Sequence, residues 1–579
     1  MCAEQAKQGN EWGLAATGIS SGGKVSRRGF LKGAGVLATV GVGIGLAGCG
    51  SSPALETPAG GTGAGGGSGN GKVAADFAIA AVPVAEAGEP AKECDYLVLG
   101  AGNCGMLSAA HAGELGLKTI VLEKNSVTGG SSVGTEVTMA FDDCKIFQEY
   151  KYGNADPNVI NVTEGRPTGT PNDIYTYFMM HNSWAANAEL VSNYIANNHR
   201  PHDFLYEHGA RPMMILPSLD APTGGIMYQG QGIGVFEIMQ AAAEEYGVEI
   251  ITEAPATALV VDGDGAVVGV MADLGGASSF IKAKAVFVGT GGFSNNADMI
   301  EALIPGYGPI AWKNDFILKH DGDGIRMMLG VGAAASDNRL AQPAASGVEG
   351  AAWESSVDKA AREPYLWVNK VGRRLGNEKW TTMDTTFKVG IKENDYTYFN
   401  VIDTKAAQRM QEQPFMTGAR TVLGNNDAIP TMIADLDDAA TTGIIYKGET
   451  LDELAQAAGI DAAALKETVD RYNEMANAGN DTEFYKDPAF LIPIEQGPFY
   501  AFKMIPAWYS TLCGVKIDGK IRVLNGDDKP IGGLFAGGLD SGEFYKDNYN
   551  HGFSGGCSGY SYFTGFFAAD NAAEHIKSL

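Results

Sequence analysis

Blocks of apolar residues along this chain change in period from strand-like to helix-like. Residues 95–99 form a short apolar run, an alanine-rich stretch follows, and a second apolar run, residues 118–124, ends in Glu123. A buried strand reads as a continuous apolar run and a helix as apolar residues three or four apart, so this order predicts a βαβ unit. Residues 248–292 predict further strands, with a hairpin turn at residues 262–265.

Helical spacing dominates three other stretches, residues 172–198, 235–246 and 451–477. In the last of these, Asp452 and Asp461 are predicted helix caps. Strand patterns follow it in sequence, and the chain ends with the pattern of an apolar helix. Alternating strands and helices of this kind predict the α/β fold class.

The turn between the first strand and its helix carries the pattern G-x-G-x-x-G. Gly100 permits the tight turn, Gly102 lets the backbone approach a pyrophosphate, and Gly105 lets the helix pack close to the strand. The helix N-terminus offers free N–H groups to phosphates, and Glu123 can accept from a ribose hydroxyl. The turn therefore predicts a dinucleotide site.

Composition narrows the choice of ligand. The 579 residues carry a formal net charge of −26, which would repel nucleic acid. None of the seven cysteines forms C-x-x-C or C-x-x-C-H, so we predict no metal site, disulfide framework or covalent haem. Asp321 and Asp323 precede a helix pattern, but the ligand series of a calcium loop is incomplete, and we interpret them as a helix cap.

The N-terminal residues contain the pattern of an export signal. Residues 26–32 contain paired arginines, an apolar run follows at residues 33–48, and the pattern is typical of a twin-arginine signal. Residues 46–49 resemble a bacterial lipobox, which would place a lipid on Cys49; ordinary cleavage nearby is the alternative. Residues 50–72 are mostly glycine, serine, alanine, threonine and proline and predict a flexible tether. We therefore expect an exported protein, lipid-anchored at the extracytoplasmic face of the membrane.

Four motifs occur in order and carry a family resemblance. They are Gly100-x-Gly102-x-x-Gly105 with Glu123, residues 128–131, residues 289–293, and residues 533–538 with Gly555 and Gly556. Together they resemble the FAD-dependent fumarate reductase and 3-ketosteroid dehydrogenase superfamily. The resemblance covers residues 95–575 and implies a Rossmann-like FAD-binding domain with an inserted α+β capping domain. Trp367–Arg374 and Asn377–Glu378 look like further family landmarks.

The resemblance implies that the FAD-binding domain is split in sequence by the capping domain. Five segments follow one another: a signal peptide with lipobox (1–48), a tether (49–92), the N-terminal segment of the FAD-binding domain (93–336), a capping domain that closes over substrate (337–497), and the C-terminal segment of the FAD-binding domain (498–579).

The resemblance also implies which residues hold FAD. The expected FAD contacts are Gly100, Ala101, Gly102, Gly105, Glu123, Lys124, Thr128, Gly129, Gly130, Ser131, Ser132, Ala256 near the adenine, Thr290, Gly291, Gly292, Gly538, Asp540 near the ribityl chain, Ser554, Gly555 and Gly556.

The substrate handles of fumarate reductases are missing. Met383 stands where the family has its proton-donating Arg, residues 509–511 replace a substrate-binding His, and residues 548–551 replace an Asn-Arg pair. A dicarboxylate would lose several charge-assisted hydrogen bonds, each worth roughly 1.5–3 kcal/mol. This argues against fumarate or succinate as substrate.

Neutral and aromatic residues stand in their place. The candidate catalytic residues are Tyr509, Tyr545, Tyr549 and His551. A phenol is a workable acid where a carbonyl polarises the alkene. We expect an FAD oxidoreductase acting on CH–CH groups, which reduces a carbonyl-conjugated C=C bond of an uncharged, steroid-like or phenolic electron acceptor.

Electrons would come from a separate membrane, haem or flavin donor. Four alternatives remain at this stage: a 3-ketosteroid-type dehydrogenase, a fumarate- or urocanate-type reductase, a benzylic ether reductase, and a lipoprotein that passes electrons without substrate chemistry.

Overall fold

The computed structural model describes residues 79–153, 155–163, 166–218, 221–303, 320–338, 341–352, 355–379, 397–416, 427–546, 549 and 554–579, without the side chains of 341–346 and 506–509. All belong to one unit, residues 67–579. Cys49, Met383 and His551 lie outside the described residues, as does the side chain of Tyr509.

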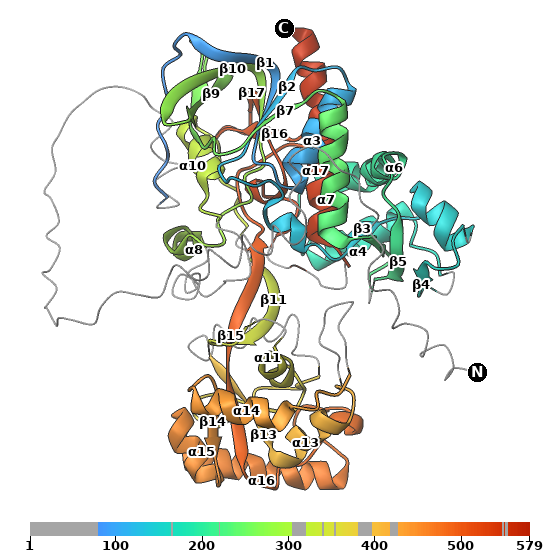
Figure 1. Ribbon diagram of the computed structural model, residues 1–579, viewed down its shortest axis with the longest axis vertical. Helices are drawn as coiled ribbons and strands as arrows, with labels where there is room; N and C mark the ends of the chain where they lie inside the picture. The colour runs from blue at the N-terminus through green and yellow to red at the C-terminus, as the bar shows by residue number, and fades with distance from the viewer. Residues whose placement is uncertain are drawn as a thin grey trace, which may run out of the picture. The chain divides into compact units, whose positions relative to one another are not determined.

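An eight-stranded mixed sheet, parallel from β17 to β7 and antiparallel at β16, β8 and β9, contains the first glycine turn at its edge (Figure 1). Its strands run in the order β16-β17-β10-β1-β2-β7, with β9 paired to β10 and β8 to β9. The bounds are β1 (Pro90–Leu99), β2 (Thr119–Leu122), β7 (Glu249–Ile251), β8 (Ala256–Val261), β9 (Val267–Leu274), β10 (Ala277–Val288), β16 (Arg522–Leu524) and β17 (Pro530–Ala536). Strands far apart in sequence thus end at one sheet edge, where Gly100 and Gly289 follow β1 and β10.

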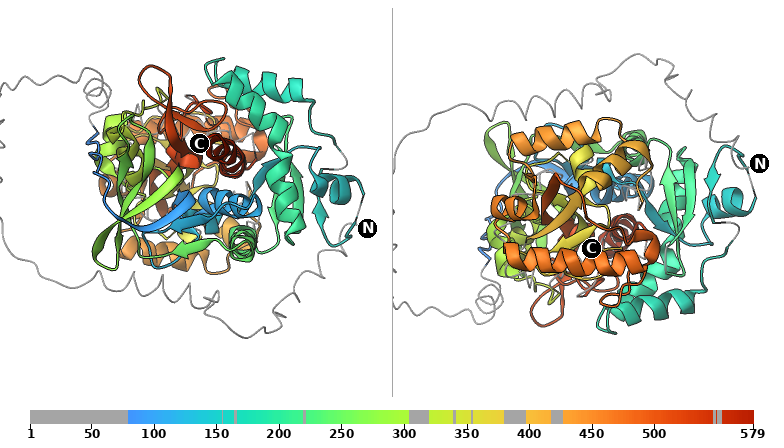
Figure 2. Two further views of the ribbon diagram at one scale, coloured as in Figure 1. Left: turned by 90° about the horizontal axis from the view of Figure 1, so that it is seen from above. Right: turned by 90° about the horizontal axis from the view of Figure 1, so that it is seen from below.

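Three helices cover this sheet near its glycine turns. Helix α3 (Asn103–Glu114) packs against both α7 (Gln231–Glu245) and α17 (Gly556–Ser578), as the views of Figure 2 agree. Leu97, Val98 and Val286 are fully buried in the core between the layers. The predicted βαβ unit and the α/β fold class are confirmed.

A second sheet, in the order β3-β6-β5-β4, adjoins the helices of residues 171–207. The strands are β3 (Thr138–Ala140), β4 (Ile160–Asn161), β5 (Pro212–Pro217) and β6 (Gly224–Tyr228); the helices are α4 (Pro171–His181), α5 (Ala188–Asn197) and α6 (His199–Glu207). The single helical stretch expected at residues 172–198 is wrong, because Ser183 and Trp184 have positive φ and end the first helix.

Residues 341–511 contribute a third sheet with its own apolar clusters, formed by residues 348–504. The strands are β11 (Ala341–Val348), β12 (Leu366–Val368), β13 (Tyr398–Asp403), β14 (Tyr446–Gly448) and β15 (Phe499–Thr511); the helices are α11 (Ser356–Ala361), α13 (Thr404–Glu412), α14 (Met432–Thr441), α15 (Leu451–Ala458) and α16 (Ala462–Ala478). Asp461 caps α16 as expected, but Thr450 rather than Asp452 caps α15.

Strand β15 joins two sets of neighbours. Phe499–Met504 pair with β13, and the remainder to Thr511 pairs with β11. In the region of the chain described here, no helix has the length and apolar character needed to cross a membrane. The described residues also hold no group of three or more His, Cys, Asp or Glu side chains suited to a metal ion.

Candidate functional site

The turn after β1 is shaped by close backbone approach. Gly100 has φ +95°, and a Cβ there would lie 2.4 Å from the Gly289 carbonyl oxygen. A Cβ on Gly105 would lie 2.0 Å from the Gly100 carbonyl oxygen. Nothing closer than the Ser132 hydroxyl at 3.4 Å would meet a Cβ on Gly102, and Ala101 is buried. Only glycine permits this approach of strand, turn and helix.

Glu123 faces this turn. Its Oε2 accepts from the Ala101 N–H at 2.9 Å, and its Oε1 accepts from the Asn125 N–H at 2.9 Å. The Asn125 side-chain amide also donates to Oε1, at 2.7 Å. A carboxylate offers about four acceptor positions, so about one remains for a ribose hydroxyl. Ala254 donates to the Glu123 carbonyl, which brings the start of β8 close to this point. Ala256 begins that strand, paired with Ala272, rather than lying in a loop.

Lys124 is held by two carboxylates. Its Nζ lies 2.9 Å from Asp323 and 3.2 Å from Asp321. These residues flank the start of α10 (Asp323–Gly330), but Gly322 is its N-cap, without a side-chain cap. The helix-cap interpretation of Asp321 is therefore wrong, because its carboxylate pairs with Lys124 instead.

The loop at residues 128–132 is tied to its surroundings by side chains. The Thr128 hydroxyl donates to Gln240 at 2.8 Å, and the Ser132 hydroxyl accepts from the Asn103 N–H at 2.8 Å. One N–H group in the first turn of α3 is therefore hydrogen-bonded to Ser132, a residue outside the helix. Gly129 donates to the Ala101 carbonyl at 2.9 Å, and Gly130 begins a 3-10 turn. This hydrogen bond places the loop beside the turn at residues 100–102.

His320 was not predicted, and it lies between two of the glycine loops. Its Nε2 is 3.2 Å from the Ser131 hydroxyl, and a Cβ on Gly291 would lie 2.9 Å from the same nitrogen. Burial, with the nearby Lys124 charge, lowers the pKa of His320 to about 4, so the ring is neutral. Its neighbours in sequence carry no pattern that separates it from a core histidine.

The glycine loop after β10 is held by Asp540. This fully buried carboxylate accepts from the Thr290 hydroxyl and the Gly291 N–H, each at 2.9 Å, and from the Gly292 N–H at 3.3 Å. Burial raises the pKa of Asp540, against the effect of these donors. Its neighbour Gly538 donates to the Thr564 hydroxyl at 2.8 Å.

Helix α17 begins at the predicted last loop. Gly555 has φ +73° and accepts from the Met139 N–H at 3.0 Å, and Gly556 is buried. Ser554 donates through its N–H to the Ser218 hydroxyl at 3.2 Å. The Cys557 N–H in the first turn donates to the Tyr549 hydroxyl at 3.4 Å.

Tyr545 and Tyr549 are brought together in a buried aromatic group. Their ring centroids are 5.1 Å apart, and Phe544 lies 4.9 Å from Tyr545. The Tyr545 hydroxyl is buried without a hydrogen-bond partner among the described residues, and burial raises its pKa well above the ordinary value. The protonated phenol is therefore the resting form of Tyr545. The structure does not describe how Tyr509 and His551 face this pair.

Two cysteines lie at the helix N-termini. Burial raises the pKa of both Cys104 and Cys557 to about 12, so both are thiols at neutral pH. Low thiolate content makes a cysteine a poor nucleophile and redox centre. Cys104 packs 3.2 Å from the position of a Cβ on Gly538, which fits a role as a small residue.

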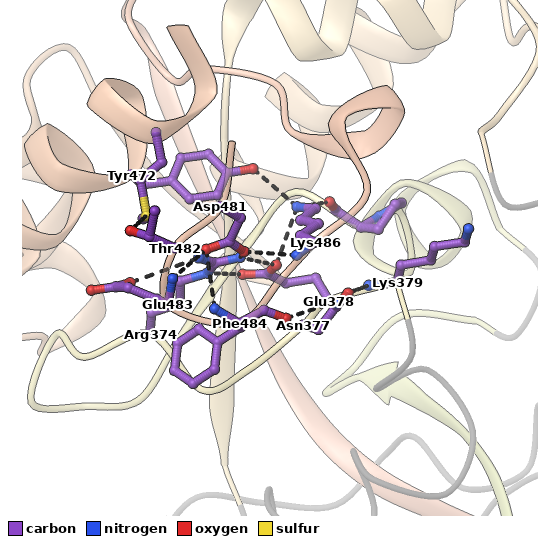
Figure 3. A network of polar contacts seen from close by, with 12 residues as sticks. Arg374, Asn377, Glu378, Lys379, Tyr472, Asp481, Thr482, Glu483, Phe484 and Lys486 are labelled. Carbon is purple, nitrogen blue, oxygen red and sulfur yellow. Dashed lines mark hydrogen bonds and ion pairs between the residues drawn. The ribbon is translucent and has the colours of Figure 1, made fainter. Parts of the chain in front are cut away.

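The landmark Arg374 and Glu378 lie in a buried ion network (Figure 3). Arg374 bonds Glu378 at 2.8 Å and Asp481 at 2.7 Å, and Lys486 lies 3.2 Å from Glu378. Despite burial, hydrogen bonds from Arg374 and backbone N–H groups hold the pKa of Asp481 below its ordinary value. Burial lowers the pKa of Lys486 to about 8.

Asn377 donates to the Phe484 carbonyl at 3.0 Å, beside the network. These landmarks therefore join residues 374–379 to residues 481–486.

The residues of the glycine turns fit a bound dinucleotide. The Gly102 position is open, Gly102 gives the first turn of α3 no side-chain cap, and Glu123 retains about one acceptor position beside it. This combination of a helix N-terminus with a glycine N-cap and a carboxylate is suited to a pyrophosphate and a ribose.

Comparison with known proteins agrees with this fit. The family described as "FAD binding domain" matches residues 154–555. The vinyl phenol reductase of Lactiplantibacillus plantarum is 26% identical over 495 residues, covering 83% of this chain and 96% of that protein. A probable fumarate reductase of Shewanella frigidimarina is 27% identical over 492 residues, covering 84% and 76%.

Among solved structures, the 3-ketosteroid Δ1-dehydrogenase of Sterolibacterium denitrificans aligns with a TM-score of 0.67 at 19% identity, covering 83% of this chain and 100% of that one. At this identity the alignment bears on the fold alone, and it confirms the expected α/β fold class. The chain therefore belongs to the FAD-binding family that includes fumarate reductases and 3-ketosteroid dehydrogenases, and it is an FAD-dependent oxidoreductase that acts on carbon–carbon double bonds.

Proposed function

We propose that this enzyme reduces the C=C bond of an uncharged, ring-bearing substrate, either a phenolic alkene or a carbonyl-conjugated ring. The observation that carries the proposal is the buried pair Tyr545 and Tyr549, which stands beside the first turn of α17 where dicarboxylate enzymes of the family place cationic handles. The likeness to a vinyl phenol reductase over 83% of the chain supports the same substrate class.

The charge of the site favours a neutral ligand. Met383, residues 509–511 and residues 548–551 stand where a dicarboxylate enzyme would have an Arg, a His and an Asn-Arg pair. Bringing a dianion into a buried aromatic site without cations would leave its charge unpaired, at a cost of several kcal/mol.

The tyrosines supply polar contacts at the reacting end. When bound, FAD supplies hydride through its N5 atom. A protonated Tyr545 or Tyr549 donates a hydrogen bond to a substrate carbonyl or phenol oxygen, or delivers a proton to the second carbon. Tyr509 and His551 are further candidates for these two roles. Residues 337–497, as a capping domain, would exclude water from the site.

Export and lipid attachment belong to the same proposal. The paired arginines and Cys49 direct the folded protein to the extracytoplasmic face of the membrane, where a separate donor protein reduces it. Replacing Cys49→Ser should release the enzyme from the membrane fraction while leaving its kcat unchanged. Retention in that fraction would contradict the lipid anchor.

Stopped-flow reoxidation of the reduced enzyme tests the substrate class. Enzyme reduced without oxygen is mixed with fumarate, urocanate, enone steroids, cinnamates and vinyl phenols, and recovery of flavin absorbance is followed. We expect the fastest recovery with a neutral ring compound. Faster recovery with fumarate would overturn the proposal and show that other cations bind the carboxylates.

Single substitutions then assign the roles. Tyr509→Phe, Tyr545→Phe, Tyr549→Phe and His551→Ala each remove one proton-bearing group. Removal of a general acid lowers the rate by about 10²–10⁴-fold, whereas removal of a packing residue alone leaves the rate near that of the wild type.

A further inference from the structure

The loop at residues 289–293 has its backbone donors occupied by protein. Gly289 donates to the Leu99 carbonyl at 2.9 Å, Gly291 and Gly292 donate to Asp540, and Phe293 donates to the Thr511 hydroxyl at 3.2 Å. None of these N–H groups is left to bind a phosphate or a flavin oxygen. A cofactor bound beside this loop would therefore find these N–H groups already occupied.

Asp540 holds three of the loop's donors at once. Its two carboxylate oxygens take the Thr290 hydroxyl and both glycine N–H groups, and the side chain is fully buried. The Thr290 hydroxyl oxygen also accepts from the Gly324 N–H at 3.2 Å, so the same cluster reaches the start of α10. With three acceptor positions occupied and no exposed surface, this carboxylate is closed to the ribityl hydroxyls expected from the sequence.

The opposite side of the loop is closed as well. A Cβ on Gly291 would lie 2.9 Å from His320, and a Cβ on Gly292 would lie 2.5 Å from the Thr511 hydroxyl. Gly292 also accepts from the Gly322 N–H at 3.0 Å. The position of the loop is thus determined from both sides, with Asp540 as the charged contact.

We infer that Asp540 is a positioning residue for FAD: it fixes the backbone of residues 290–292 against the cofactor without contacting the cofactor itself. This assignment differs from the direct contact with the ribityl chain that the family resemblance implies. It explains why a fully buried carboxylate lies among glycines rather than beside a cation.

The test separates loop positioning from direct contact. Full-length, FAD-saturated protein is compared as wild type, Asp540→Asn, Thr290→Val, Thr290→Ser and the double variant Asp540→Asn/Thr290→Val. Three quantities are measured: amide hydrogen exchange of residues 289–293, the Kd of FAD, and the visible circular dichroism of the bound flavin. Thr290→Ser is the matched control, because it retains the hydroxyl that bonds Asp540.

If Asp540 acts through the loop, Asp540→Asn speeds exchange of the loop amides and weakens FAD binding, each by about tenfold or more, and alters the flavin dichroism. Thr290→Val produces smaller changes in the same direction, Thr290→Ser restores wild-type behaviour, and the double variant is no worse than Asp540→Asn alone.

Three results would overturn the inference. Weaker FAD binding with unchanged loop exchange would make Asp540 a direct ligand. Faster exchange with unchanged Kd and dichroism would make it structural only. Additive effects in the double variant would separate Asp540 from Thr290. If Asp540→Asn does not fold, the pair Thr290→Val and Thr290→Ser decides between these outcomes, because Thr290→Val must then change exchange, Kd and dichroism together.

Discussion

Two regions of this molecule fix their backbone by opposite means. Around the glycine turns, one carboxylate and many backbone N–H groups hold residues 289–293 at close range. In the third sheet, the network of Arg374, Glu378, Asp481 and Lys486 does the same with side-chain charges (Figure 3). The first arrangement surrounds one buried carboxylate with N–H and hydroxyl donors; the second pairs buried carboxylates with arginine and lysine. Backbone and hydroxyl donors therefore hold a buried carboxylate in one region, whereas charged side chains do so in the other.

The largest effect should come from adding a methyl group where the backbones touch. Gly105→Ala places a Cβ 2.0 Å from the Gly100 carbonyl oxygen, so α3 must move away from β1. We expect the purified variant to carry no FAD, measured by its visible absorbance. Gly263→Ala, with open space around its Cβ, should bind FAD as the wild type does. Normal flavin content in Gly105→Ala would contradict the requirement for glycine at this position.

Removing one charge from the ion network should cost stability rather than cofactor. Arg374→Met leaves Glu378 and Asp481 buried without their main partner, a loss of about 3–5 kcal/mol. The measurement is the midpoint of denaturant unfolding together with FAD content at low denaturant. Loss of FAD without loss of stability would place the network's role at the cofactor instead.

The free energy of unfolding should depend on pH through the buried His202. His202 is fully buried between the Tyr228 hydroxyl and the Met139 carbonyl, and burial lowers its pKa from 6.5 to about 4. Its contribution to stability is present above pH 6.5 and is lost as pH falls toward 4, by about 3 kcal/mol. Thermal unfolding of His202→Gln should depend less steeply on pH over this interval; an equal slope would contradict the assignment.

The smallest effect should come from an exposed pair. Lys466 and Asp470 lie 2.8 Å apart on α16, both 59% exposed. Because water and salt screen such pairs, Lys466→Ala should leave the unfolding midpoint and FAD content unchanged. A marked loss would mean that surface charge, and not burial, sets the stability of this region.

The sequence predicts those regions of the site in which local chemistry decides the structure. Gly100, Gly105 and Glu123 are recognisable because glycine and an acid at fixed spacing have few other uses beside a buried strand. The partners of Asp540 and the position of His320 could not be predicted, because they depend on contacts between residues far apart in sequence.

Some helix ends could be predicted from local sequence and others could not. Asp461 is predictable as a cap because an acid stands directly before the helix pattern. The break at Ser183 and Trp184 is not, since neither residue favours positive φ and both are exposed.

The register of β11 against β15 pairs Ala341 with Thr511. The segment of 169 residues between them therefore begins and ends at neighbouring positions of one sheet. Such an excursion can be exchanged as a cassette. A graft from a related enzyme at these two points should alter which molecules are turned over while the flavin spectrum stays the same.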